Sequence, residues 1–184
     1  DSIEYLGHNI SHNGLTPHEA KISAIKELRP PQDISECRAQ LGFFAYYSGY
    51  VPGYSEVVRP MTKLTSKAVS WTWGEEQQRA HDSVKALLCK PGLVIKRLDY
   101  SKPIRLYTDW SKDGLSAVLG QPDGDKECMV ACISRSCNKH EAKYASYQGE
   151  MLAAVWGMRS LRHMLDGVHF TVVTDHQPLC WLMS

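Results

Sequence analysis

Three acidic residues stand where a folded chain could bring their carboxylates together. Asp109 and Asp175 each end a β-prone run, and Glu150 lies within a run of helical period. If the two strands are neighbours and the helix packs across them, the three groups converge, and a divalent cation with oxygen ligands would offset their repulsion. Two Mg²⁺ ions about 4 Å apart can activate a water and stabilise the leaving oxygen of a phosphodiester. The simpler alternative is that acids at strand ends are solvated starts of loops.

The elements that would position these acids lie in the second half of the chain. Three consecutive strands favour an antiparallel meander, and a following helix crosses over to a strand parallel to the first. We therefore expect an α+β or α/β fold with a mixed sheet over residues 91–184. The predicted strands cover residues 103–109, 115–120, 128–133 and 169–174, and the helix covers residues 143–165.

The first half, residues 1–90, has the pattern of an all-helical subdomain preceded by a hairpin. The hairpin is predicted over residues 3–15, with its turn at Asn13-Gly14, because this dipeptide tolerates positive φ. Three sets of polar and acidic residues have the spacing of a capping box, and each predicts the start of a helix. These sets are Thr16–Glu19, Asp33–Glu36 and Thr72–Glu75, and a shorter helix broken by Pro60 is expected over residues 57–64.

The composition excludes several classes of protein. A hydrophobic content of 43% is too high for a disordered tail, and from the sequence we expect neither a membrane-spanning segment nor a secretory signal. Because 21 Lys and Arg balance 20 Asp and Glu, contact with nucleic acid must come from local patches. Six scattered cysteines without a CxxC pair indicate reduced thiols. We expect an intracellular protein, cytoplasmic or nuclear, with no membrane insertion.

An ordered set of motifs resembles the polyproteins of Ty3/gypsy-type retrotransposons. Their ribonuclease H domain is similar to the segments LYTDWSKDGLSAVLGQ, ISRSCNKHEAKYASYQGEMLAAVW and FTVVTDHQPLCWL. Their reverse-transcriptase thumb and connection resemble YLGHNISHNGL, LGFFAYYSGYVPGYSEVVRPMTKL and WTWGEEQQRAHDSVKALL. The resemblance implies a thumb- and connection-like subdomain over residues 1–90, and this helical half would contact the duplex by its backbone. It also implies a ribonuclease H-like domain over residues 91–184 that ends before the family's last strand and helix.

The resemblance assigns roles to individual residues. Asp109, Glu150 and Asp175 match the family's catalytic acids, which would hold two Mg²⁺ (or Mn²⁺) ions. The implied reaction is hydrolysis of the RNA strand of an RNA–DNA hybrid, which proteins recognise by 2′-hydroxyl contacts and groove shape. Packing within the protein is an equal alternative for the tyrosines among the candidate nucleic-acid contacts. These candidates are Tyr46, Tyr47, Tyr50, Ser111 and His176.

Departures from the family pattern support a second hypothesis. The polymerase palm is not in the chain, and the last strand and helix, which usually bring a fourth acidic or histidine partner, are missing. Arginines common in the family give way to YYSGY at residues 46–50, which weakens phosphate contact, and the indole of Trp110 could crowd the substrate. The chain would then be a domesticated relic, a non-catalytic binding or structural subunit of a larger assembly. Under the enzyme hypothesis its partners are the palm, the downstream polyprotein segments and the hybrid.

Overall fold

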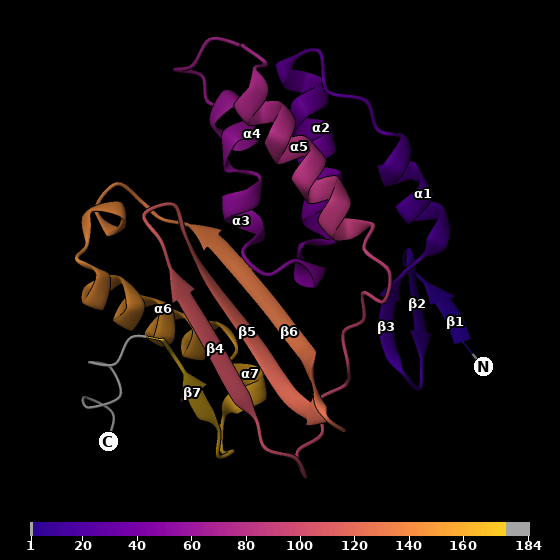
Figure 1. Cartoon of the computed structure of the whole chain (residues 1–184), viewed down its shortest axis with the longest axis vertical. Coiled ribbons are helices and arrows are strands. Elements are labelled where there is room, and N and C mark those ends of the chain that lie inside the picture. The colour runs from indigo at the N-terminus through magenta and orange to yellow at the C-terminus, as the bar shows by residue number, and fades with distance from the viewer. Residues whose placement is uncertain (1, 176–184) are drawn as a thin grey trace.

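A computed structural model of the chain describes residues 2–175. Two sheets and a group of helices make up the molecule, and in the view of Figure 1 the helices of the first half lie above a small N-terminal sheet and a larger C-terminal one. The boundary predicted at residue 90 falls in the segment between the last of these helices and the first strand of the larger sheet.

The N-terminal strands form a three-stranded antiparallel sheet instead of the single predicted hairpin. They are β1 (Ser2–Tyr5), β2 (His8–Ser11) and β3 (Gly14–Pro17), in the order β1-β2-β3. The additional reversal is at Leu6 and Gly7, whose φ angles of 48° and 77° are both left-handed. Such a turn favours Asn or Gly at its first position, so a leucine there gives no sequence signal. The turn predicted at Asn13-Gly14 lies one position earlier, at His12 and Asn13, because Gly14 already pairs with Ser11 as the first residue of β3.

Five α-helices and a 3-10 turn follow this sheet, and only one of the three predicted capping boxes lies where it was expected. The carboxylate of Asp33 accepts a hydrogen bond from the Glu36 backbone N–H at 2.8 Å. The first helix begins after His18 because Thr16 pairs with β2, and the last begins after Gly74. The elements are α1 (Glu19–Glu27), α2 (Ile34–Tyr46), η1 (Ser48–Tyr50), α3 (Tyr54–Val57), α4 (Arg59–Leu64) and α5 (Glu75–Leu88).

Pro60 starts a helix and does not break one. The expected helix over residues 57–64 is divided at Val58 into α3 and α4, and Pro60 occupies the first turn of α4. The first turn of a helix leaves its N–H groups without intrahelical partners, so the missing N–H of proline costs nothing there. The helices share one core, whose fully buried side chains include Ile25, Phe44, Met61, Val84 and Leu88.

The larger sheet has the predicted topology. Its order is β6-β5-β4-β7, with β4 and β7 parallel and the other neighbours antiparallel. Helix α6 packs against β4 and β5 and lies behind the sheet in the view of Figure 1. The elements are β4 (Arg105–Trp110), β5 (Gly114–Asp123), β6 (Lys126–Ser136), η2 (Glu141–Lys143), α6 (Ser146–Ser160), α7 (Arg162–Leu165) and β7 (Thr171–Val173).

The helical half and the larger sheet are in direct contact. Helix α3 and the turn η1 pack against β6. Between the halves, the backbone of Ile95 exchanges hydrogen bonds of 2.8 and 2.9 Å with Leu15 of β3. The second core is formed by the sheet with α6 and α7, and its buried members include Leu106, Ala117 and Leu119.

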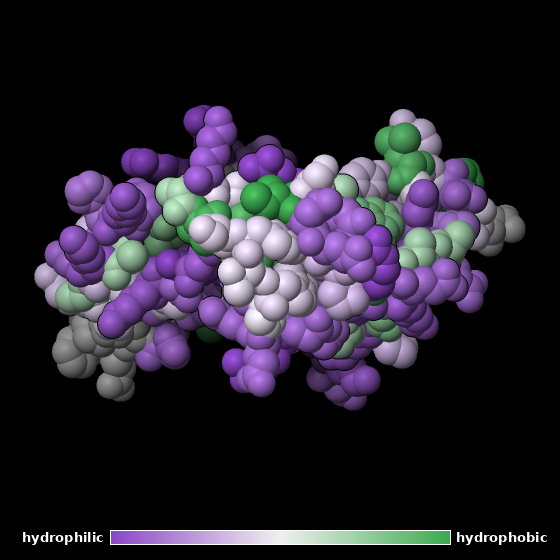
Figure 2. All heavy atoms as spheres, turned by 90° about the horizontal axis from the view of Figure 1, so that it is seen from above, coloured by the Kyte–Doolittle hydropathy of each residue, from purple (hydrophilic) through white to green (hydrophobic). Residues whose placement is uncertain are grey.

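The outer surface is largely polar. Seen from above, hydrophilic side chains cover most of the molecule and hydrophobic ones occur in small groups (Figure 2). Within residues 2–175, every helix is too short or too polar to cross a bilayer.

Candidate active site

The parallel pairing of β4 and β7 places two of the three predicted acids at one edge of the sheet. Tyr107 and Val173 are the last paired residues in this ladder, and Asp109 and Asp175 each follow two positions later. Both aspartates are exposed. Because parallel strands end at the same edge, continued register brings these carboxylates to the same end of the two strands.

Helix α6 supplies the third acid by packing unusually closely on the sheet. A Cβ atom at Gly149 would lie only 2.0–2.5 Å from three atoms of the Trp110 ring, and one at Gly157 would lie 2.9 Å from the Ala117 Cβ. The indole of Trp110 therefore packs beneath α6, which corrects the expectation that it would crowd the substrate. Glycine at both positions lets the helix approach β4 and brings Glu150 to the end of that strand.

Glu150 reaches the aspartates around the end of β4. The register pairs Asp109 with Ser116 and Ser116 with Ser134, so these side chains share the face of the sheet opposite α6. Glu150 approaches from the α6 side, beside the backbone N–H of Trp110. That N–H lies beyond the last pair of the β4–β7 ladder. The three acids thus lie toward the same edge of the sheet.

Burial and like charge both act on Glu150. Its side chain belongs to a residue that is only 7% exposed. Burial is the main cause that raises the pKa of the Glu150 carboxyl to about 7, and the negative charges of Asp109 and Asp175 add to it. A hydrogen bond from the Trp110 backbone N–H lowers this pKa. The pKa of Glu150 therefore depends on the charge of both aspartates.

The three acids offer only oxygen ligands, the type that divalent cations such as Mg²⁺ prefer. Within residues 2–175, no three His, Cys, Asp or Glu side chains are close enough to enclose a metal ion. Like charges repel, so carboxylates without a cation are expected to stand apart. Among the described residues, however, the Glu150 Oε2 atom is buried and has no hydrogen-bond partner. A hard cation with oxygen ligands would satisfy this atom and neutralise its neighbours.

Ser111, a predicted nucleic-acid contact, uses its hydroxyl in hydrogen bonds within the protein. Its hydroxyl donates a hydrogen bond to Glu56 of α3. It also accepts hydrogen bonds from the backbone N–H groups of Asp113 at 3.0 Å and Gly114 at 3.1 Å. Ser111 therefore shapes the turn between β4 and β5, directly after the Asp109 strand end.

The three predicted tyrosines, at the end of α2 and in η1, bond to residues of the N-terminal sheet and its first turn. Tyr47 and Tyr50 are buried, and their hydroxyls bond to the Gly7 carbonyl at 3.2 Å and to His8 Nδ1 at 2.9 Å. Tyr46 donates to the Leu6 carbonyl but leaves 52% of its surface exposed. The structure thus places Tyr47 and Tyr50 in packing roles, and only Tyr46 presents an accessible ring. His176 lies outside the described residues.

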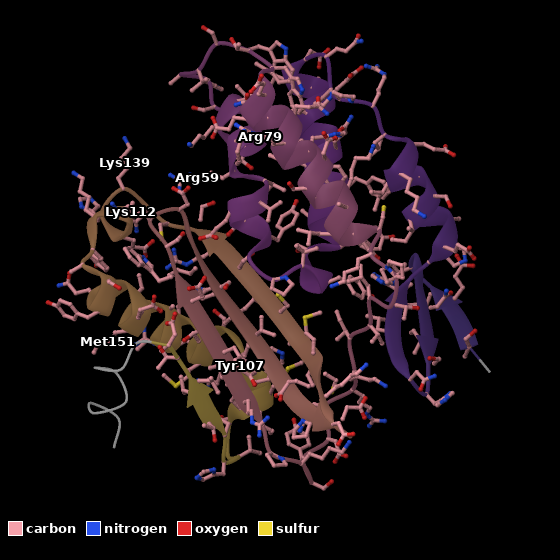
Figure 3. The ribbon with its side chains drawn as sticks, in the orientation of Figure 1. Arg59, Arg79, Tyr107, Lys112, Lys139 and Met151 are labelled. Carbon is pink, nitrogen blue, oxygen red and sulfur yellow. The ribbon has the colours of Figure 1, made fainter. Side chains whose placement is uncertain are left out.

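Basic side chains beside the site were missed by the sequence reasoning. Arg59 of α4 forms an ion pair with Asp113 and donates to the Lys112 carbonyl at 3.4 Å. Figure 3 shows Arg59, Lys112 and Lys139 at the same end of the sheet. The Cys137 backbone N–H, close to Lys139 in sequence, donates to the Asp113 carbonyl at 3.1 Å. No local spacing could reveal this group, because Arg59 is more than fifty positions from its partners.

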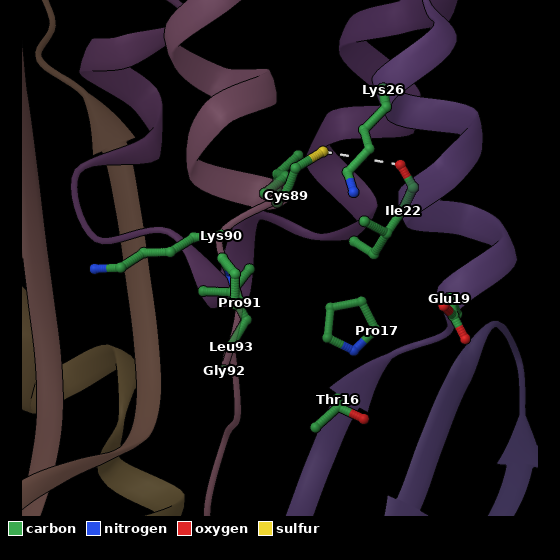
Figure 4. A pocket seen from close by; sticks show the side chains of 11 residues that line it. Thr16, Pro17, Glu19, Ile22, Lys26, Cys89, Lys90, Pro91, Gly92 and Leu93 are labelled. Carbon is green, nitrogen blue, oxygen red and sulfur yellow. Dashed lines mark hydrogen bonds between the residues drawn. The ribbon is translucent and has the colours of Figure 1, made fainter.

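A surface pocket elsewhere lacks the features of a reaction site. It has a volume of about 330 Å³ and lies between α1 and the end of α5 (Figure 4). The Cys89 thiol on its wall donates a weak hydrogen bond to the Ile22 carbonyl at 3.8 Å, and burial raises the pKa of that thiol. A thiol with a raised pKa is a poor nucleophile.

Comparison with known proteins extends over the whole chain. Residues 99–184 match the model of an RNase H-like domain found in reverse transcriptase. In Drosophila melanogaster, the retrovirus-related Pol polyprotein from transposon opus is 34% identical over 99% of this chain. The one from transposon gypsy is 31% identical over all of it. In Schizosaccharomyces pombe (strain 972 / ATCC 24843), the transposon Tf2-3 polyprotein is 32% identical over 96% of the chain. This chain spans 13–19% of the length of these relatives.

Solved structures share the fold at low sequence identity. The foamy viral protease-reverse transcriptase in complex with dsDNA superposes with a TM-score of 0.80 at 19% identity, over 99% of this chain and 38% of that one. The same protein in complex with an RNA/DNA hybrid gives a TM-score of 0.76 at 17% identity, over 97% and 25%. The arrangement of helical half and mixed sheet is therefore shared with these structures.

Proposed function

We propose that this chain hydrolyses the RNA strand of RNA–DNA hybrids. Residues 99–184 belong to the RNase H-like domains found in reverse transcriptase. Homologues of the whole chain are Pol polyproteins of gypsy-type and Tf2 transposons. Asp109, Glu150 and Asp175 would be the catalytic acids. The observation that carries the proposal is the buried Glu150, which has an unpartnered oxygen and is coupled to both aspartates.

The three carboxylates would hold two Mg²⁺ or Mn²⁺ ions. When bound, such ions supply a nucleophilic water at neutral pH and charge stabilisation for the leaving oxygen. The contribution of the chain is to position the acids. The β4–β7 register would bring Asp109 and Asp175 to the same end of their strands, and the close packing of α6 would hold Glu150 at the edge of β4. The burial of Glu150 limits its exposure to water and strengthens its attraction for a cation.

The substrate would be held mainly through its backbone. Lys112 and Lys139 are exposed at the same end of the sheet as the turn that follows Asp109. Their ammonium groups suit phosphate contacts, which provide affinity without reading sequence. Solved structures with the same fold contain dsDNA or an RNA/DNA hybrid, which supports a duplex as the ligand. Tyr46, the one accessible tyrosine of its group, can contribute a further contact.

The alternative of a non-catalytic relic is disfavoured by the energetics of Glu150. A carboxylate that is buried near two others destabilises the fold in its charged form. A structural subunit gains nothing from this arrangement, whereas a cation site requires it. Retention of all three acids in one environment therefore favours the enzyme.

A cleavage assay tests the proposed function. The substrate is an end-labelled RNA–DNA hybrid with Mg²⁺, and the variants are Asp109→Asn and, as a matched control, Asp125→Asn at the exposed tip of the β5–β6 hairpin. We expect the wild type and Asp125→Asn to cleave the RNA strand and Asp109→Asn to be inactive. Equal background cleavage by all three proteins would refute the enzyme and leave the binding subunit.

A further inference from the structure

Two residues of the helical half contact the turn that follows Asp109. The carboxylate of Glu56 in α3 accepts a hydrogen bond from the Ser111 hydroxyl, and Arg59 of α4 forms an ion pair with Asp113. Arg59 also donates to the Lys112 carbonyl at 3.4 Å. Each residue of the turn, from Ser111 to Asp113, is therefore bonded to the helical half.

The same turn is held from within the sheet half. The Ser111 N–H donates to the Gly114 carbonyl at 2.9 Å, and the Cys137 N–H donates to the Asp113 carbonyl at 3.1 Å. The Ser111 hydroxyl also accepts hydrogen bonds from the backbone N–H groups of Asp113 and Gly114. Ser111 is thus a shared point, because its oxygen both closes the turn and bonds to Glu56.

The surfaces around this point fit closely. A Cβ at Gly114 would lie 3.0 Å from both Glu56 Cγ and Ser55 Oγ. The Ser55 backbone N–H donates to Ser134 Oγ at 3.0 Å. Ser134, Ser116 and Asp109 form one row across the sheet, so the helical half docks on the row that ends at the catalytic aspartate.

We propose that Glu56 and Arg59 are positioning residues for the acidic site, which act through the β4–β5 turn to fix Asp109. This inference rests on the proposed function. The Arg59–Asp113 pair is partly exposed, with side chains 25% and 55% accessible, and such pairs contribute little to global stability. Their effect is expected in the local geometry of the site, where misplacement of a reacting group by about 1 Å can reduce the rate by about 100-fold.

The test compares Arg59→Ala and Glu56→Ala with the charge-swapped double variant Arg59→Asp/Asp113→Arg. We expect each single variant to cleave the hybrid about 10- to 100-fold more slowly and to need more Mg²⁺ for half-maximal rate, with an unchanged melting temperature. The double variant should recover most of the rate. Arg29→Ala is the control, because it breaks a surface pair with Glu36 (2.7 Å) far from the turn along the chain. Arg29→Ala should behave as the wild type.

Amide hydrogen exchange gives a readout that does not depend on activity. Exchange at residues 111–114 should be faster in Arg59→Ala and Glu56→Ala than in the wild type, and should be restored in the double variant. If the wild type fails to cleave the hybrid, the proposed function fails, and exchange alone decides the positioning role. Unchanged exchange at the turn in both single variants would overturn the inference, as would wild-type cleavage and Mg²⁺ dependence in both.

Discussion

Glu150 combines three properties that rarely occur together in a residue without a function. It is buried, one of its oxygens has no hydrogen-bond partner among the described residues, and two aspartates raise its pKa further than burial alone. Buried carboxylates are normally paired, because the charged form is costly in a medium of low polarity. A bound cation would give the unpartnered oxygen a ligand partner and would neutralise the charge that burial and the two aspartates make costly.

Glu150 should therefore make the metal-free protein less stable as the pH rises. Its pKa is about 7 in the folded state and is ordinarily 4.5, so between these values the folded state holds a proton that the unfolded state has lost. Stability falls as the pH rises through this window. Glu150→Gln should be more stable than the wild type by about 1–3 kcal/mol at pH 8, and much less so at pH 5. Urea unfolding in EDTA at both pH values measures the difference; a difference independent of pH would contradict it.

The sequence sufficed to predict the elements that carry the acids, but not the surroundings of the tyrosines. Asp109 and Asp175 follow runs of β pattern and Glu150 lies in a helical period, so the elements that hold them could be predicted. Tyr47 and Tyr50, in contrast, are buried against Gly7 and His8, about forty positions away. No local pattern indicates whether an aromatic side chain packs against a distant turn or faces a ligand.

At the scale of elements, α6 packs closely on β4 because the large Trp110 ring faces Gly149, which has no side chain. Gly149→Ala would introduce a Cβ that overlaps the Trp110 ring. We expect it to destabilise the protein by about 1–3 kcal/mol and to reduce hybrid cleavage, because α6 must move away from the sheet with Glu150.

Gly42 provides the matched control for this substitution. It also lies inside a helix, but a Cβ there would meet nothing within 4 Å. Gly42→Ala should therefore stabilise the protein by about 0.5–1 kcal/mol. Thermal unfolding of both variants is the measurement, and equal effects of the two alanines would show that the α6–β4 contact is not tight.

The order of the strands and helices followed from the sequence more reliably than their boundaries. The meander, the crossover helix and the parallel strand were predicted by alternation and helical period. Two of the three capping boxes were misplaced, because Thr16 pairs in β3 and Gly74 starts α5. A cap motif records only local preference, and pairing with another strand overrides it.

At the scale of the molecule, the chain has almost no net charge, yet Lys112 and Lys139 lie at the same end of the sheet as its acidic site. Lys112→Ala/Lys139→Ala should weaken hybrid binding and reduce the slope of log affinity against log salt by about 1–2, since each phosphate contact contributes about 0.9. Lys26→Ala/Lys90→Ala, at the pocket between α1 and the end of α5, is the control and should leave the slope unchanged. Salt titrations followed by fluorescence anisotropy measure both. Equal slopes for the two double variants would exclude these lysines from the duplex surface.

Binding of a divalent cation is the property on which the nuclease mechanism depends. Calorimetric titration with Mn²⁺ should show binding to the wild type and to Asp125→Asn. The affinity should fall by about tenfold or more in each of Asp109→Asn, Glu150→Gln and Asp175→Asn, because each removes a charged ligand. If the wild type binds no Mn²⁺, or if the three variants bind it as well as the wild type, the three carboxylates do not form a shared metal site.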